Sequence, residues 1–311
     1  MSQKILITSV AAKTSLIQRV KEAKEKFDAS LQIIGADADA NAIGAYFTDF
    51  FWHMPKLQNL VFETFLEYCF QNSIRYIIPT RDADVLYFSQ HKTQLLAKNI
   101  HLFTCDEKTA AFCFDKLRFY EEGEKEWTIF SSQNVETLQT QHFVVKERYG
   151  SGANKIAINV DKTQAKKWAI SLQEPIFQPY IQGQEYSIDS YVDNSNKCKA
   201  CIIRSRDVVI GGESKVTTIL KDTVLQHKVA AFLEKYRIQG HSVTQVIKQE
   251  NNYFLIECNT RFGGASSLSY EVGLESFYWF LQEANGETIE VKLSEKCLMQ
   301  VRSQQDSYFE C

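Results

Sequence analysis

Short apolar runs alternate with amphipathic stretches along the first hundred residues of the chain. The runs predict buried strands, and the stretches between them carry apolar residues at helical spacing. The expected strands span residues 4–8, 31–35 and 74–79, and the expected helices span residues 16–26, 59–71 and 84–98. Strands and helices in alternation predict a parallel sheet with right-handed crossovers. We therefore expect an α/β domain in this part of the chain.

The turn after the first expected strand lacks a dinucleotide-binding motif. Residues 10–15 contain no G-x-G-x-x-G sequence, so the fold class resembles Rossmann but no motif supports NAD binding. Ligands of open α/β sheets bind at the carboxyl ends of the strands, which makes Thr80, Arg81 and Asp82 candidates to contact a substrate. These residues can instead cap the next helix, and the sequence leaves both interpretations open.

A lysine at the end of a strand and a loop of small residues mark the middle of the chain. The strand 143–146 ends in Lys146, and Gly150-Ser151-Gly152 follows soon after it. Such a loop lets backbone N–H groups approach a phosphate closely, although alone it is also typical of a hairpin turn. No Walker A sequence is present. Further strands are expected at 176–181 and 186–193, with a turn at 182–184 between them.

A predicted hairpin carries the strongest chemical signal. Its strands span 243–248 and 253–259, and alternation along the second strand places Glu257 and Asn259 on one face. Hairpin pairing brings Gln245 near the same face. A carboxylate and two amide oxygens are hard ligands that suit Mg²⁺, whose remaining ligands are commonly waters and substrate phosphates.

Groups suited to phosphate follow this hairpin directly. Arg261 offers a guanidinium fork to phosphate oxygens, and Gly263-Gly264 leaves the backbone accessible. A lone E-x-N on a strand is more often a solvated sheet face. The complete hairpin followed by an arginine and two glycines favours a metal and phosphate site.

In order and spacing these parts resemble the ATP-grasp superfamily, and most of all its carbamoyl-phosphate synthetase large-subunit-like branch of small ligases. The resemblance covers nearly the whole chain. It implies an α/β fold with an α+β lid, in which a Rossmann-like pre-ATP-grasp domain (residues 1–106) precedes a two-lobed ATP-grasp fold. The small lobe, or lid, is expected at residues 107–185 and the large C-terminal lobe at residues 186–311.

The resemblance also implies roles for individual residues. Two lysines would hold the ATP phosphates, a glycine-rich loop would cover them, a hinge would hold adenine through its backbone, and a glutamate would bind the ribose. The phosphate lysines are Lys116 and Lys146, and the loop is Gly150, Ser151 and Gly152. The adenine hinge consists of Gln178, Pro179, Tyr180 and Ile181, and the ribose-binding glutamate is Glu185. Mg²⁺, with Mn²⁺ as an alternative, would bind Gln245, Glu257 and Asn259. Arg261 and Lys215 would act on the γ-phosphate, the latter from the loop 211–215.

The chain departs from the family pattern at a few positions. Glu147 and Thr260 stand where the family usually has proline, and neither change removes a ligand. The segment between Lys116 and Lys146 is abridged. The chain has a single ATP-grasp unit, whereas carbamoyl-phosphate synthesis uses two in that family, so this reaction is not expected.

The implied activity is that of an ATP-dependent ligase. Such an enzyme activates a carboxylate as an acyl phosphate, joins it to an amine or a thiol, and releases ADP and phosphate. Two alternatives remain open, namely an ATP-binding regulatory or scaffold protein without turnover, and a kinase or synthetase that acts on a non-carboxylate. Arg204 and Arg206 lie two apart on one strand face, where they can dock the carboxylate or form exposed ion pairs.

Charge and hydrophobicity give no sign of a nucleic-acid or membrane partner. The net charge is −3 without a basic tract, and no apolar run approaches the length of about 18–20 residues that spans a bilayer. We therefore expect neither nucleic acid nor membrane as partner, and a cytoplasmic location. The family resemblance implies small-molecule carboxylate and amine substrates, and a homodimer is common in the family. The pair Cys198 and Cys201 is not expected to bind zinc or act in redox chemistry, because positions three apart on a strand face opposite sides. Cys258 is expected to point inward.

Overall fold

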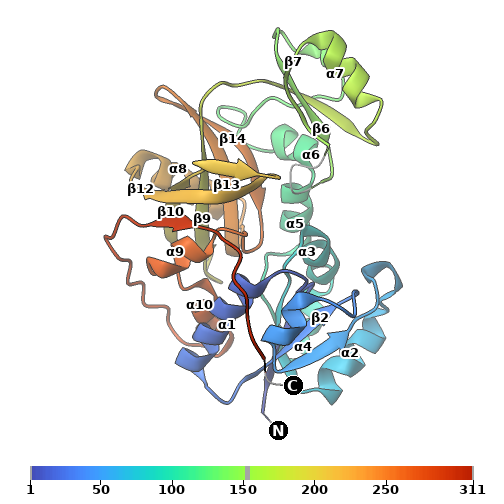
Figure 1. Ribbon diagram of the computed structural model, residues 1–311, viewed down its shortest axis with the longest axis vertical. Coiled ribbons are helices and arrows are strands. Elements are labelled where there is room, and N and C mark those ends of the chain that lie inside the picture. The colour runs from blue at the N-terminus through green and yellow to red at the C-terminus, as the bar shows by residue number, and fades with distance from the viewer. Residues whose placement is uncertain (1, 151–154, 310–311) are drawn as a thin grey trace.

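The computed structural model describes residues 2–150 and 155–309. Its N-terminal domain is built around a parallel five-stranded sheet (Figure 1). Alternation of strands and helices predicted this architecture, and the prediction is confirmed. The strands, in sheet order, are β3 (Phe50–His53), β2 (Gln32–Asp37), β1 (Lys4–Thr8), β4 (Ile74–Ile78) and β5 (His101–Leu102). The helical elements are α1 (Thr14–Phe27), η1 (Ile43–Phe47), η2 (Leu57–Asn59), α2 (Phe62–Gln71), α3 (Asp82–Ser89) and α4 (Lys92–Ala97).

Two details of this domain differ from the expectation. The single helix expected at 84–98 is divided into α3 and α4 at residues 90–91. A new helix starts there, and its first hydrogen bond joins the Leu95 N–H to the carbonyl of His91. The edge strands β3 and β5 were not predicted, since they are short and β3 is largely unburied.

A larger antiparallel sheet forms the C-terminal lobe. Its strands, in sheet order, are β11 (Val208–Ile210), β12 (Glu213–Leu220), β10 (Cys198–Ser205), β9 (Gln184–Val192), β13 (Gly240–Gln249) and β14 (Asn252–Asn259), and β15 (Met299–Val301) pairs with β12. Helix α8 (Thr223–Lys235) packs on one face in a cluster that includes Ile188, Ile203 and Val246. Helices α9 (Ser267–Glu271) and α10 (Ser276–Ala284) share a second cluster with Tyr191 and Ile202 on the other face.

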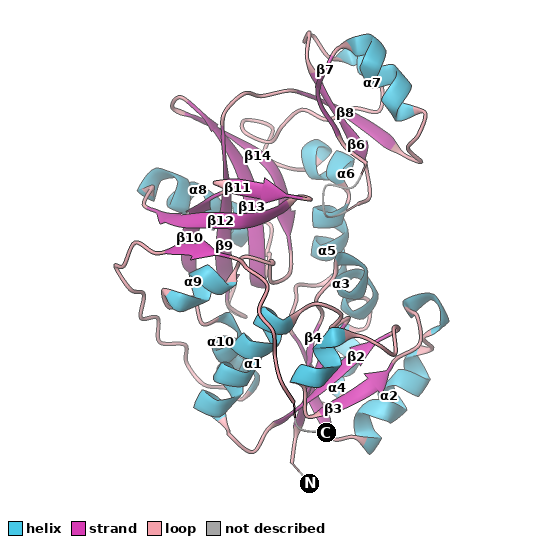
Figure 2. Cartoon of the chain, in the orientation of Figure 1, coloured by secondary structure: helices cyan, strands magenta, loops and turns pink. Residues whose placement is uncertain are grey.

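A third, small sheet stands at one end of the molecule (Figure 2). It consists of β7 (Ala157–Val160), β6 (Phe143–Glu147) and β8 (Pro175–Pro179), covered by α7 (Lys162–Ala169), and has its own core. The segment before it holds α5 (Glu107–Phe114), α6 (Lys116–Glu121) and η3 (Val135–Thr137). Phe112 and Phe119 of α5 and α6 pack in the α8 cluster, so these helices lie against the large lobe.

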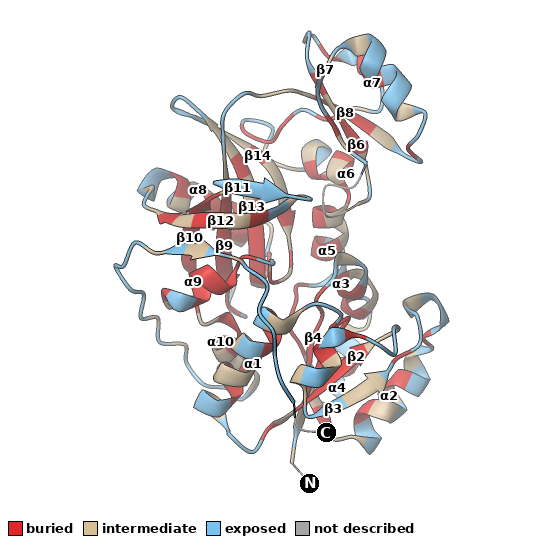
Figure 3. Cartoon of the chain, viewed as in Figure 1, coloured by how far each residue is buried: buried red, intermediate tan, exposed pale blue. Residues whose placement is uncertain are grey.

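One apolar cluster joins the N-terminal domain to the large lobe. It runs from β1, α1 and β4 to α9 and α10, and Trp279 is fully buried within it. Phe277 and Phe280 of the same helix are buried in this cluster as well. Figure 3 shows burial concentrated in the two larger sheets, whereas β11 and much of α7 are exposed. The shared core holds the carboxyl ends of the parallel strands close to the large sheet, where the candidate site lies.

Candidate active site

A row of polar side chains crosses four strands of the large sheet. Backbone pairing places Arg204 of β10 opposite Ser187 of β9, Ser187 opposite Gln245 of β13, and Gln245 opposite Glu257 of β14. Directly paired residues point to the same face of a sheet, so these four side chains share one face. Asn259 lies two residues beyond Glu257 and donates a hydrogen bond to it, with 3.0 Å between Asn259 Nδ2 and Glu257 Oε1. The predicted grouping of Gln245, Glu257 and Asn259 on one face is confirmed.

An irregularity in the hairpin separates this polar face from the core. Gln245 pairs with Glu257 but the next residue, Val246, pairs with Leu255, so β14 carries one extra residue, Ile256. The resulting bulge lets Leu255 join the cluster under α8 while Glu257 points to the other side. Cys258 is buried in the same cluster, which confirms that it faces inward.

Two lysines bring positive charge to Glu257. Burial alone would raise the pKa of the Glu257 carboxyl, but the charges of Lys116 and Lys146 outweigh it and hold that pKa below its usual value. Lys146 is only 8% exposed. Its burial lowers the pKa of its ammonium group to about 8, with partial compensation from the negative charge of Glu257. The sequence-predicted phosphate lysines and metal ligands therefore lie within one electrostatic cluster.

An ion pair that the sequence did not reveal holds the two lysine segments together. Asp115 caps the N-terminus of α6, and Arg148 donates to its two carboxylate oxygens over 2.7 and 2.6 Å. The Lys116 ammonium group, directly after Asp115, donates to the carbonyl oxygen of Gly150. The start of the small-residue loop therefore lies at Lys116, while Ser151 and Gly152 fall outside the described residues.

The predicted ribose and adenine positions flank this cluster. Glu185 lies 3.0 Å from Arg206, and burial raises the pKa of its carboxyl despite the opposing effect of that guanidinium. Gln178 and Pro179 end β8, and Tyr180 and Ile181 begin the connection to β9. Gln178 is buried and donates through its side chain to Ser131, and the Tyr180 N–H donates to the carbonyl of His142. Since the Tyr180 N–H already has a partner, adenine contacts through the backbone would fall to its neighbours.

Arg261 reaches across to the N-terminal domain. Its Nε and Nη2 atoms donate to the two carboxylate oxygens of Asp82 over 2.7 and 3.0 Å. Asp82 is the first residue of α3, and it lines a pocket together with Lys116, Glu257 and Asn259. The N-cap of α3 is Arg81, whose side chain makes no capping bond. Neither sequence interpretation of Asp82, as substrate contact or as helix cap, anticipated this partner.

The neighbouring candidates have structural partners of their own. Thr80 is buried, and its hydroxyl donates to the carbonyls of Thr8 and Ser9. Arg81 is 55% exposed and pairs with the buried Asp84. These contacts fix the β4–α3 turn against the end of β1.

Lys215 occupies a strand instead of the expected loop. Gly211 and Gly212 form the turn of the β11–β12 hairpin with φ values of 58° and 78°, which favour glycine, and β12 begins at Glu213. The Lys215 ammonium group lies 3.0 Å from Glu213, to which Arg302 also binds at 3.1 Å. No described contact joins Lys215 to the lysines or to the metal-ligand candidates, and its role at the γ-phosphate stays a prediction.

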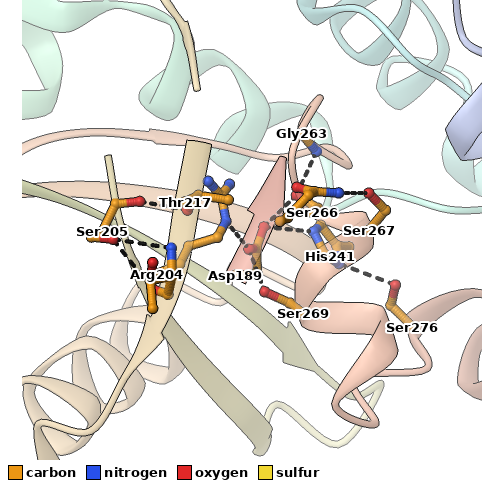
Figure 4. Close-up of polar contacts among 12 residues, drawn as sticks. Asp189, Arg204, Ser205, Thr217, His241, Gly263, Ser266, Ser267, Ser269 and Ser276 are labelled. Carbon is orange, nitrogen blue, oxygen red and sulfur yellow. Dashed lines mark hydrogen bonds and ion pairs between the residues drawn. The ribbon is translucent and has the colours of Figure 1, made fainter. Parts of the chain in front are cut away.

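Arg204 is anchored in a buried network (Figure 4). It is 3% exposed, and its Nε atom lies 2.6 Å from a carboxylate oxygen of the fully buried Asp189. Ser266 and Ser269 also donate to Asp189, and His241 lies 3.5 Å away. Arg204 is therefore neither an exposed ion-pair partner nor an accessible docking group.

The expected separation of Cys198 and Cys201 is wrong. Their sulfur atoms lie 3.4 Å apart, because the pairing of β10 with β9 shifts between Cys198 and Ala200 and turns the two side chains to the same side. In the described part of the chain no three His, Cys, Asp or Glu side chains gather to hold a metal ion. The pair therefore has no further ligand of these types for zinc.

Two protein-family models match the sequence. One, described as the N-terminal domain of PylC-like proteins, matches residues 5–103, and the other, described as the ATP-grasp in the biosynthetic pathway with Ter operon, matches residues 171–306. Residues 171–306 therefore form a domain of the ATP-grasp superfamily. The predicted superfamily is confirmed for this part of the chain.

Solved ATP-grasp structures share this fold. The ADP complex of N5-carboxyaminoimidazole synthetase from Staphylococcus aureus is similar with a TM-score of 0.73 and 15% identity, over 96% of this chain and 82% of that one. Biotin carboxylase from Campylobacter jejuni has a TM-score of 0.72 and 13% identity, over 94% of this chain and 74% of that one. L-amino acid ligase from Bacillus licheniformis has a TM-score of 0.69 and 14% identity, over 91% of this chain and 74% of that one. The comparison with curated proteins gives no match.

The candidate metal ligands of this ATP-grasp chain fit Mg²⁺. Glu257 is held charged, and Asn259 directs its amide nitrogen to one Glu257 oxygen, which leaves the Asn259 carbonyl oxygen and the second Glu257 oxygen for a cation. Gln245 contributes a further amide oxygen from the paired position. One carboxylate with amide oxygens is a typical protein contribution to Mg²⁺ when phosphates supply other ligands.

Some site residues escaped the sequence analysis. Asp115 and Arg148 are ordinary charged residues in sequence, and their importance depends on partners far away along the chain. Lys13, in the turn after β1, is another: burial and then the charge of Arg261 lower the pKa of its ammonium group. The rule that ligands bind at strand carboxyl ends could have identified Lys13, because β1 lies beside β4 in the sheet.

Within the described residues, no helix is long and apolar enough to cross a membrane.

Proposed function

We propose that this chain is a carboxylate–amine or carboxylate–thiol ligase that forms an acyl phosphate and releases ADP and phosphate. The observation that carries the proposal is the convergence of Lys116, Lys146 and Arg261 on the face that holds Glu257 and Asn259. Attack of a carboxylate on the γ-phosphorus brings two anions together, so such a reaction requires concentrated positive charge.

Each group has a defined part in the proposed reaction. Mg²⁺, held by Gln245, Glu257 and Asn259, would neutralise β- and γ-phosphate charge when bound. Lys116 and Lys146 would hold the phosphates in place. A carboxylate oxygen of the substrate forms a bond to the γ-phosphorus while the bond from that phosphorus to the β–γ bridging oxygen breaks and ADP leaves.

The second step consumes the acyl phosphate. The amine or thiol attacks the acyl carbon, its proton passes to solvent or a base, and inorganic phosphate leaves. In the first step, Arg261 would stabilise charge on the transferring phosphoryl group.

Supporting observations come from similar proteins. Two of the similar structures are those of an N5-carboxyaminoimidazole synthetase and an L-amino acid ligase. A third structure is described as a dimer of a biotin carboxylase domain with MgADP and bicarbonate. We propose by analogy that this chain takes small-molecule substrates and can form a homodimer. We also propose a cytoplasmic location, in keeping with the free cysteines of the described residues.

The experiment that tests the proposal requires no knowledge of the natural nucleophile. Purified protein is incubated with ATP, Mg²⁺, hydroxylamine and a panel of amino acids and small organic acids. If one acid is activated, phosphate and a hydroxamate should appear together, depend on Mg²⁺, and vanish in Arg261→Ala. Formation of AMP and pyrophosphate would show an adenylate and overturn the acyl-phosphate mechanism. Nucleotide binding without product from any acid would favour the regulatory alternative.

A further inference from the structure

A single ion pair links the candidate phosphoryl-transfer residue to the other domain. Asp82 and Arg261 are 179 residues apart in sequence, and both side chains are largely buried, with 12% and 18% exposed. The bond is bidentate, with Nε to Oδ1 and Nη2 to Oδ2. It occupies two of the five N–H groups of the guanidinium, so three remain for an incoming anion.

Asp82 itself is held firmly. It begins α3 directly after the turn in which Thr80 donates to the carbonyls of Thr8 and Ser9. Asp84, two residues further along the same turn of helix, is fully buried and accepts a hydrogen bond from the Thr8 hydroxyl at 2.9 Å. The carboxylate of Asp82 therefore projects from a rigid part of the parallel sheet.

The direction of this carboxylate sets it apart from a helix cap. Asp82 makes no capping bond to the backbone of α3, and the pocket that it lines also contains Lys116, Glu257 and Asn259. We propose that Asp82 is a positioning residue, which fixes the Arg261 guanidinium so that its free N–H groups meet the γ-phosphate of ATP. The N-terminal domain thereby completes a site whose other parts belong to the ATP-grasp lobes. This inference rests on the proposed role of Arg261 in phosphoryl transfer.

The physical advantage is preorganisation. An arginine side chain has several rotatable bonds, and ordering them only when ATP arrives would weaken binding. With Asp82 present, the side chain is already ordered and the fork has a set orientation. Because ADP has no γ-phosphate, loss of this positioning should weaken binding of ATP more than binding of ADP.

The test is a double-mutant cycle on nucleotide affinity. Calorimetry with Mg²⁺ measures the Kd of ADP and of the non-hydrolysable β,γ-imido analogue of ATP. The Kd of ADP divided by the Kd of the analogue reports how strongly the protein recognises the γ-phosphate. Asp82→Asn removes the charge, Asp82→Glu restores it on a longer side chain, and Arg261→Ala removes the positioned group. Arg81→Ala is the matched control, because Arg81 is the neighbouring residue and pairs only with Asp84 among described contacts.

The expected ratio falls about tenfold in Asp82→Asn, as it does in Arg261→Ala, and recovers to within about threefold in Asp82→Glu. In the Arg261→Ala background, Asp82→Asn should change the ratio by less than about twofold, since its effect passes through Arg261. The Arg81→Ala ratio should equal that of the wild type. Thermal unfolding checks that every variant is folded, and Asp82→Ala replaces Asp82→Asn if the latter is not.

Other outcomes would overturn the inference. An equal loss for both nucleotides, with a lower unfolding temperature, would make the pair a structural link between domains. A rise in affinity for the ATP analogue would show that Asp82 competes with phosphate. Additive effects of the two substitutions would show that Asp82 acts independently of Arg261. The cycle needs no acid substrate, so a failed hydroxamate screen would refute the proposed ligase reaction and leave this result interpretable.

Discussion

The buried Lys146 predicts an unusual pH dependence of nucleotide binding. Burial lowers the pKa of its ammonium group to about 8 in the free protein. Phosphate groups beside it would stabilise the charged form and raise that pKa in the complex. The free protein therefore loses the Lys146 proton as the pH rises through 8, while the complex keeps it. Binding then takes up a proton and weakens with increasing pH.

The magnitude follows from the titration. With a pKa of about 8, Lys146 is roughly nine-tenths charged at pH 7 and roughly one-tenth charged at pH 9. The Kd for ATP should rise about tenfold across this range, which corresponds to about 1.4 kcal/mol. At pH 8, about half a proton should be taken up for each ATP bound, and calorimetry in buffers of different ionisation enthalpy measures this uptake directly.

Lys146→Arg is the decisive control. An arginine stays charged throughout this pH range, so its Kd should be nearly constant from pH 7 to 9, whatever its absolute value. Any titration of the nucleotide or of other groups would remain in this variant. A Kd that does not change with pH in the wild type, or the same slope in Lys146→Arg, would refute the assignment of Lys146 as a phosphate-binding residue with a lowered pKa.

Three further substitutions test the site and its support. Glu257→Gln should abolish turnover at all Mg²⁺ concentrations while circular dichroism and most of the ADP affinity stay unchanged, because an isosteric amide lacks the ligand charge; near-normal phosphate release would contradict this. Glu185→Ala should weaken ATP binding by about 1–3 kcal/mol in calorimetry, the cost of unmatched ribose hydroxyls, and an unchanged Kd would exclude the ribose role. Asp189→Asn should lower the free energy of unfolding in urea by about 3–5 kcal/mol, because it leaves the Arg204 charge buried without a counter-ion; a loss below about 1 kcal/mol would show that Arg204 finds another partner.

Local patterns predicted the elements and the part of the site that lies within one of them. The spacing of Glu257 and Asn259 on a strand, and the return of the hairpin to Gln245, follow from the two-residue period alone. The alternation of strands and helices likewise predicted that β1, β2 and β4 belong to a parallel sheet. These features depend only on neighbours in sequence, so a single sequence is sufficient to reveal them.

Contacts between distant segments could not be predicted in this way. The partner of Arg261 is Asp82, and the partner of Arg148 is Asp115, and in both cases the two residues belong to different elements. Arg204 was interpreted as a group that docks the carboxylate or as an exposed ion-pair partner, but it is buried beside Asp189 because β9 and β10 pair in one particular register. The shift beside Cys198 is a further example, since a bulge changes the side-chain direction and leaves no mark in the residue types.

The polar row across the large sheet restricts how the length of this chain can change during evolution. Ser187, Gln245 and Glu257 face the same side only because every strand between them keeps its register. One inserted residue within β9 would turn Glu185, Ser187 and Asp189 toward the core under α8 and bury their polar groups there. Insertions and deletions should therefore accumulate in turns such as residues 193–197 and 250–251, whereas the strands change by substitution alone. A library that varies loop length at these turns would diversify the chain while leaving the polar row in register.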